Sequence, residues 1–243
     1  IGAAPPSVPS LPFTERVEPA PIYGALKLAG KVGPRLSIGL LSALTGQNDV
    51  PYGTGGSGLQ VLTLDQLALF NALRLKYQIA TNAHLGFFGG AVVRFEQGAQ
   101  YQTTPLPGGQ PGQICPDGSV VSRGARCSNN AFVMALDGRW RSAGGMYLVS
   151  GQALLTALHD GSPRTQRDGT LVRPGAFGVG GLVRMAKEGG EHWSAYAELE
   201  VSDKNLDYND LGFMRRQNLA SFTGQFELHT LRPWWKTNET RTW

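Results

Sequence analysis

The sequence is poor in charged residues. Asp, Glu, Lys and Arg make up 16% of its 243 residues, whereas an average soluble domain has about 25%. Because 41% of the residues are hydrophobic, the chain has too much apolar surface for a disordered polyelectrolyte. Its net charge of +4 is modest, and its Lys and Arg residues do not cluster with aromatic residues. We therefore expect no nucleic-acid partner.

Long apolar runs are absent as well. No run approaches the roughly 20 apolar residues that a transmembrane helix needs. The 33 glycines and 15 prolines argue against long helices of any kind, because Gly and Pro destabilise a helix interior by roughly 1 and 3 kcal/mol per residue. What remains is a β-rich chain with enough apolar surface for one large sheet or barrel.

Cysteine and histidine are too few and too scattered to predict a metal site. The four histidines lack the H-E-x-x-H spacing of a zinc site, and no further ligand accompanies Cys115 and Cys127. Eleven residues separate the two cysteines in a loop-like stretch, which fits a small disulfide in an oxidising compartment. Two free thiols are the alternative. We expect no metal and no cofactor.

Nine segments alternate apolar and polar side chains with the period of two that is typical of a β-strand. In the clearest of them, Phe222 and Phe226 alternate with Thr223 and Gln225. The expected strands are 22–32, 36–45, 73–79, 84–95, 132–140, 145–155, 177–185, 193–202 and 219–231.

The connections between these strands alternate in length. Short turns are expected near 33–34, 81–82, 141–144 and 188–190, and long loops over 46–65, 96–129, 156–172 and 203–215. Outer-membrane barrels have short periplasmic turns and long extracellular loops. The sequence therefore predicts an all-β fold, an antiparallel up-and-down transmembrane β-barrel. The alternative is a soluble antiparallel barrel or sandwich whose polar face meets solvent.

In a membrane barrel, one face of each strand meets lipid and the other a polar lumen. Charged side chains on the second face are solvated rather than buried without partners, which would cost several kcal/mol each. The expected lumen-lining residues are Lys27, Lys31, Arg74, Lys76, Asp137, Arg139, Arg184, Glu198, Glu200, Glu227 and His229. Aromatic residues near strand ends are expected to form a girdle at the interface: Tyr23, Trp140, Trp193, Trp234 and Trp235.

Nine strands are an odd number, whereas bacterial single-chain barrels have an even number. An open sheet would also leave two edges in lipid, which is not tolerated. We therefore expect 22–243 to be a partial barrel that belongs to a longer polypeptide. The Pro-rich segment 1–21 is expected to be part of an extracellular loop.

Three motifs resemble the carboxy-terminal barrel of an uncharacterised bacterial outer-membrane family. They are GALKLAGKVG (24–33), GEHW (190–193) and NDLGFMRR (209–216), and the likeness covers most of 22–232 in the expected order. Members of that family place a carbohydrate-binding domain, similar to binding-module family nine, ahead of the barrel. The resemblance implies an outer-membrane location. The long loop that contains Cys115 and Cys127 is not part of it.

A charged cluster surrounds the last motif: Asp207, Asn209, Asp210, Arg215 and Arg216. It fits a charged ring or plug contact near the extracellular mouth. The favoured interpretation, however, is a tight turn in which Asn and Asp bond their own backbone and the arginines pair with acids. GVGGLVR (178–184) lacks the Lys-Ser/Thr of a phosphate loop and is interpreted as a strand with close neighbours.

Glu198 and Glu200 share one face, roughly 6 to 7 Å apart along a strand. This spacing suits a carboxylate pair for glycoside hydrolysis, but lumen lining is the favoured interpretation. No other catalytic cluster occurs, so an enzyme is the less favoured class.

We expect a pore or solute-binding channel in the outer membrane, linked to carbohydrate binding or uptake. Its mixed charge predicts no strong ion preference. Its expected partners are the lipid bilayer, lipopolysaccharide, a carbohydrate solute and a plug or envelope protein. The alternatives are an envelope anchor or assembly component, and a barrel attached to a carbohydrate-active hydrolase.

Overall fold

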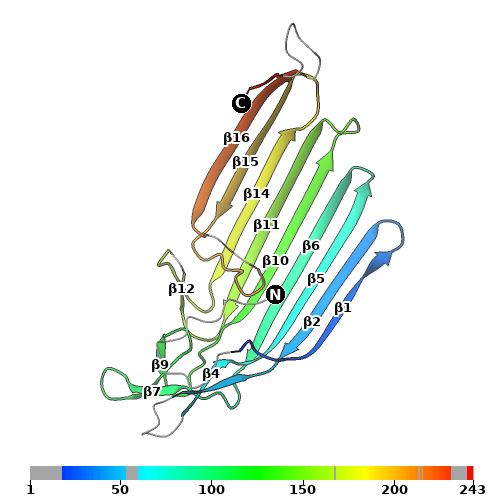
Figure 1. Cartoon of the computed structure of the whole chain (residues 1–243). Helices are drawn as coiled ribbons and strands as arrows, with labels where there is room; N and C mark the ends of the chain where they lie inside the picture. Colours follow the sequence, from blue (N-terminus) through cyan, green and yellow to red (C-terminus); the bar gives the residue numbers. More distant parts are fainter. Residues whose placement is uncertain are drawn as a thin grey trace.

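The structure, a computed structural model, describes residues 18–52, 60–166, 168–212, 214, 216–230 and 240–242. Its main feature is a ten-stranded sheet in which every neighbouring pair is antiparallel (Figure 1). In spatial order, its strands are β1 (Ile22–Val32), β2 (Leu36–Thr45), β5 (Leu67–Ala80), β6 (Ala83–Phe95), β10 (Asn130–Arg141), β11 (Tyr147–His159), β14 (Phe177–Lys187), β15 (Trp193–Ser202), β16 (Leu219–Thr230) and β17 (Thr240–Thr242).

The predicted all-β, antiparallel class is confirmed. The described residues contain no helix, and therefore none long enough to cross a membrane. Strands β1 and β17 lie at the two edges of the sheet, so the described part of the chain does not close into a barrel.

Three of the predicted strands, β1, β2 and β15, have the predicted bounds. The prediction of a strand over 145–155 was wrong at both ends, since β11 begins at Tyr147 and continues to His159. The cause is its pairing with β10, which runs in register from Arg141↔Leu148 to Asn130↔His159. The connection after β11 therefore begins at Asp160, four residues later than expected, and runs up to β14.

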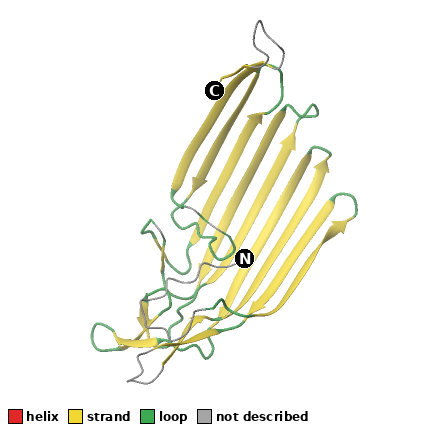
Figure 2. Cartoon of the chain, viewed as in Figure 1, coloured by secondary structure: helices red, strands yellow, loops and turns green. Residues whose placement is uncertain are grey.

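Three of the four long connections contain small sheets of their own, so treating these three as loops throughout was wrong. They hold a hairpin of β3 (Asn48–Tyr52) and β4 (Gln60–Asp65), a sheet of β7 (Gln102–Pro105), β8 (Pro111–Ile114) and β9 (Val120–Ser122), and a short hairpin of β12 (Arg164–Thr165) and β13 (Leu171–Val172). Figure 2 shows these connections gathered at one end of the large sheet and the short turns at the other. We call these the loop end and the turn end.

The loop end has small apolar cores of its own. Val50, Tyr52, Leu62 and Leu64 from the β3–β4 hairpin pack together, and Tyr101 from the next long connection packs against them. The hydroxyl of Tyr101 accepts a hydrogen bond from Gln66 at 2.9 Å. These contacts join two connections that are separate in sequence.

The large sheet has two chemically different faces. Along β10, Phe132, Met134 and Leu136 are exposed, whereas the alternating Ala131 and Val133 are buried. We call the first side the apolar face. Its large exposed side chains include Leu26, Leu28, Ile79, Leu85, Phe132, Met134, Leu136, Phe177, Val179, Val183, Met185, Leu199, Phe222, Phe226 and Leu228.

Candidate functional site

The opposite side of the sheet is the charged face. Strand register places all eleven of the predicted lumen-lining residues on this face. One row of directly paired residues crosses most of the sheet: Lys31, Ser37, Lys76, Gly86, Asp137, Gln152, Leu182 and Glu200. Residues from strands far apart in sequence are therefore brought side by side by pairing alone.

An ion pair spans three strands in the middle of this face. Arg74 on β5 reaches across β6 to Asp137 on β10, with Nη1–Oδ1 at 2.5 Å and Nη2–Oδ2 at 2.9 Å. Gly86 lies between them, and a Cβ there would collide with both side chains. The glycine therefore leaves the space in which the two-pronged pair forms.

A second polar group lies on β14 and β15. The guanidinium of Arg184 lies 4.3 Å from the ring centroid of Tyr196, and its Nη1 is 3.5 Å from Glu198 Oε2. Glu200, two residues further along, has no ion-pair partner among the described residues. At the turn end, His229 Nε2 lies 3.1 Å from the carbonyl oxygen of Gly190, which ties this ring to the turn.

The connection between β15 and β16, residues 203–218, folds over the charged face. We call it the covering loop, and residues 213 and 215 lie outside its described part. Leu206 is buried against Gly178 and Gly180 of β14, where a Cβ on either glycine would overlap Leu206. Leu211 occupies the corresponding space above Gly90. Glycines in the strands therefore allow the loop to lie directly on the sheet.

A buried ionic network fixes the covering loop. Asp210 pairs with Arg94 from the end of β6 and with Arg164 from β12, the latter at 2.5 Å. Arg164 also donates to Asn129 at 2.7 Å and lies 3.4 Å from the buried Asp207. The carboxylate of Asp210 therefore joins the covering loop to β12 and to the end of β6.

The opposite charges in this network keep its buried side chains ionised. Burial acts to raise the pKa of Asp210, but the charges of Arg164 and Arg94 outweigh it and hold this pKa below its usual value. Burial likewise acts to lower the pKa of Arg164, and Asp210 and Asp207 outweigh it to give a net rise. Both groups therefore stay charged near neutral pH.

The motif NDLGFMRR is in part the predicted tight turn. Asp207 accepts hydrogen bonds from the backbone and side-chain nitrogens of Asn209, and Asn209 accepts one from the backbone nitrogen of Met214. The described partners of Asp210, however, are arginines distant in sequence, which the sequence analysis missed. Arg215 lies outside the described residues, and Arg216 is on the wall of the cavity described next.

A cavity of about 900 Å³ lies between the covering loop and the charged face. Its polar wall includes Arg74, Asp137, Arg184, Glu200, Tyr208 and Arg216. Burial, and then the charge of Glu200, raise the pKa of Tyr208, so its hydroxyl remains a hydrogen-bond donor at neutral pH. A cavity of this size with a few polar groups of both signs suits a small polar ligand.

No protein-family model, curated protein or solved structure matches this chain. Within the described part of the chain, no group of three His, Cys, Asp or Glu side chains lies close enough to hold a metal ion.

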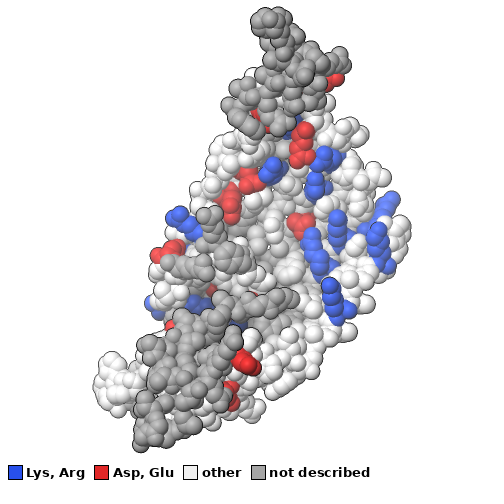
Figure 3. Space-filling model, viewed as in Figure 1, with Lys and Arg blue, Asp and Glu red and all other residues white. Residues whose placement is uncertain are grey.

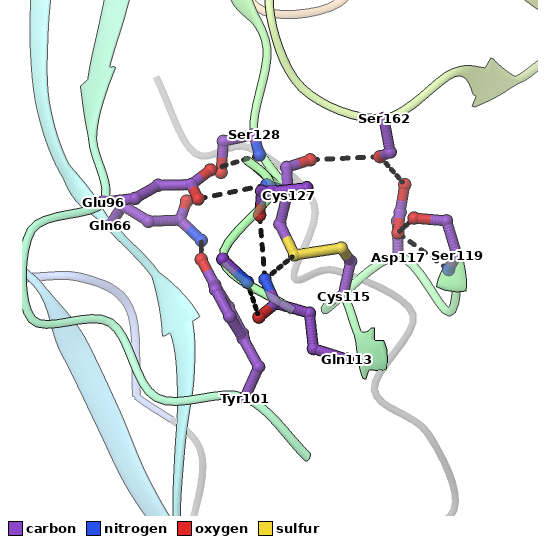
Figure 4. The surroundings of a disulfide bond; sticks show 12 residues. Gln66, Glu96, Tyr101, Gln113, Cys115, Asp117, Ser119, Cys127, Ser128 and Ser162 are labelled. Atoms are coloured by element: carbon purple, nitrogen blue, oxygen red, sulfur yellow. Dashed lines mark hydrogen bonds between the residues drawn. A yellow bond between two sulfur atoms is a disulfide. The ribbon is translucent and has the colours of Figure 1, made fainter. Parts of the chain in front are cut away.

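The predicted disulfide between Cys115 and Cys127 is confirmed, and both residues are buried (Figure 4). Its surroundings connect several loops. Glu96 accepts hydrogen bonds from the backbone nitrogens of Cys127 and Ser128, and Ser162 Oγ donates to the carbonyl oxygen of Cys127 at 3.1 Å. The bridge therefore lies at the centre of the layer of loops rather than at an isolated loop tip.

Proposed function

We propose that this sheet is part of the wall of a bacterial outer-membrane β-barrel, with its apolar face toward lipid and its charged face lining a polar lumen. In this proposal the cavity beneath the covering loop binds or passes a polar solute, with carbohydrate as the favoured class. The turn end faces the periplasm and the loop end faces outward, toward lipopolysaccharide.

The contrast between the two faces carries the proposal. Leu136, Phe177 and Phe222 are between 62% and 73% exposed, and they belong to an apolar surface that continues across the sheet. Soluble monomers rarely expose contiguous apolar patches of more than a few hundred Å². Lipid would remove this surface from water, while the charged face would remain hydrated.

Aromatic residues at both ends of the apolar face support the same orientation. Trp140, Tyr147 and Trp193 lie at the turn end, and the ring centroid of Trp193 lies 4.0 Å from Lys187 Nζ. Phe95 and Phe177 lie at the loop end. Aromatic side chains flank the apolar band of membrane barrels at both interfaces. Of the predicted girdle, Trp234 and Trp235 lie outside the described residues.

The orientation can be tested by placing the same charge on either face of β16. Phe226 is on the apolar face and 54% exposed, and the adjacent Gln225 is exposed on the charged face. Because both lie near the middle of the strand, we expect Phe226→Arg to cost about 2–4 kcal/mol in membrane stability and Gln225→Arg to cost much less. The measurement is folding of the full-length protein into lipid vesicles, followed by its heat-modifiable migration on gels.

Equal tolerance of the two substitutions would refute the membrane orientation. A pore function is tested separately by the conductance of the full-length protein in planar bilayers. Folding into vesicles without conductance would instead support a plugged, solute-binding barrel.

A second candidate function is an envelope anchor or assembly component. It is favoured by the ordered layer of β3–β4 and β7–β9, which the disulfide stabilises at the loop end. Capture of envelope proteins by full-length protein, but not by a variant without residues 96–129, would support this role. The hydrolase alternative has weaker support, because Glu198 of the proposed carboxylate pair lies beside Arg184.

A further inference from the structure

The charges on the charged face are divided between its two sides. The side formed by β1, β2, β5, β6 and β10 carries a group of cations that we call the basic strip. It consists of Lys27, Lys31, Arg74, Lys76 and Arg139. The other side, on β14, β15 and β16, carries three carboxylates, Glu198, Glu200 and Glu227, together with Arg184, which pairs with Glu198, and His229. Strand β11 between the two sides has no charged residue on this face. Figure 3 shows Lys and Arg gathered over the β1 side of the face.

Most cations of the basic strip are not neutralised by the protein. The only carboxylate among the described charged-face positions of these five strands is Asp137, which pairs with Arg74. Lys27, Lys31, Lys76 and Arg139 are exposed and have no ion pair or side-chain hydrogen bond with the described residues. Their mutual repulsion would be relieved by a bound anion.

The spacing of these cations favours an extended ligand. Lys31 and Lys76 are both paired in register with Ser37, so their Cα atoms are two strand spacings apart, about 10 Å. Lys27 lies four residues from Lys31 along β1, about 13 Å. A single phosphate or carboxylate cannot contact all three, whereas a chain with several negative charges can.

The type of cation also favours an extended ligand. Three of the five are lysines, which act as mobile point charges and do not fix the orientation of one planar anion as a bidentate arginine does. Hydrogen-bonding side chains, among them Ser37, Gln78 and Gln152, lie on the same face. They would meet the hydroxyl groups of a saccharide.

We propose that the basic strip binds an acidic oligosaccharide, with its carboxylates on the lysines and Arg139. This inference rests on the proposed function, which it deepens by assigning the solute a charge. Glu200, on the other side of the face, repels the same ligand and favours its binding on the β1 side. The expectation of no ion preference, which came from adding the charges together, is replaced by a preference that depends on their positions.

The proposal is tested by titrating full-length protein in detergent with tetragalacturonate and, separately, with the uncharged maltotetraose, using calorimetry. We expect tetragalacturonate to bind at least about tenfold more tightly in low salt, and the difference to shrink near 1 M salt, where the Debye length is about 3 Å. The double variant Lys31→Gln, Lys76→Gln should weaken tetragalacturonate binding about tenfold to thirtyfold. The matched control is Lys204→Gln, an exposed lysine of the covering loop, which should bind as the wild type does.

Equal affinity for the two tetrasaccharides, or unchanged binding by the double variant, would overturn the basic strip as an anion site. If the double variant fails to fold, Lys27→Gln and Arg139→Gln serve instead, each with an expected loss of about threefold. Conductance of the same samples in bilayers separates the two proposals. Conductance without anion preference would refute only the proposal that the basic strip binds anions. Anion binding without membrane insertion would refute only the proposal of a membrane barrel.

Discussion

Replacing Asp210 by Asn should release the covering loop while leaving the sheet folded. The carboxylate is 6% exposed and pairs with Arg94 and Arg164, whose side chains are 19% and 22% exposed. Removing one partner of a buried ion pair typically costs 3–5 kcal/mol, because the other charge remains buried. Here Arg164 keeps Asp207 and Asn129 as partners, so we expect about 2–4 kcal/mol.

At 1.4 kcal/mol per factor of ten, this loss raises the open fraction of the covering loop by about 30-fold to several hundredfold. Hydrogen exchange of residues 203–212, followed by mass spectrometry on full-length protein, measures the change directly. The matched control is Asp49→Asn, an exposed carboxylate of β3 whose described hydrogen bonds come from Gln47 and Thr63, not from the covering loop. Exchange in β10 and β11 should not change in either variant.

The effect of pH on the covering loop follows from the ion pairs of the Asp210 carboxylate. The pKa of Asp210 is held below the value of about 3.9 that an unfolded aspartate has. Its contribution to loop stability is therefore complete above pH 4 and is lost as the pH falls through the lower folded value. Equal loop exchange in wild type and Asp210→Asn at pH 7, or a loss of protection beginning above pH 5, would refute the assigned role of this carboxylate.

Two further predictions concern how the loops are held. Gly178→Val should displace the covering loop and reduce its stability by about 1–3 kcal/mol, because the valine side chain would overlap the backbone of Asn205 and Leu206. The control is Gly30→Ala on β1, where an added Cβ meets nothing within 4 Å. Equal hydrogen exchange of the covering loop in both variants would contradict this packing. Cys115→Ser should cost about 3 kcal/mol in the stability of the β7–β9 segment, as expected for a bridge between residues 12 apart in sequence. Faster proteolysis within 96–129 without loss of the large sheet would support this, and unchanged proteolysis would contradict it.

The sequence allowed prediction of the strands and of the two faces because both depend on local periodicity. Lys31 and Glu200 could be assigned to one side of their strands from the residues beside them. Their positions in one row across the sheet also depend on register, which follows from the pairing of neighbouring strands. Strand ends were predicted less well where the alternation weakens: β5 begins at Leu67, six residues before the expected start at 73.

The covering loop could not be predicted, since its contacts join distant segments. The pair of Asp210 with Arg94 bridges 116 residues, and that with Arg164 bridges 46. Nothing local in the sequence distinguishes these arginines from others of the chain. The glycines of 178–184 did indicate close neighbours, but the close neighbour of Gly178 is a loop, which periodicity cannot reveal.

The covering loop also determines which part of the charged face a solute can reach. Along β10, the charged-face residues near the loop end are the small apolar Ala131, Val133 and Ala135, each 4% exposed or less. Asp137 and Arg139 follow toward the turn end, where the face is open. Along β10, small side chains thus occupy the buried part of the charged face, and charged ones occur further toward the turn end. If the sheet lines a lumen, the basic strip is accessible from the turn end even while the covering loop is closed, and Asp210→Asn should increase access from the loop end alone.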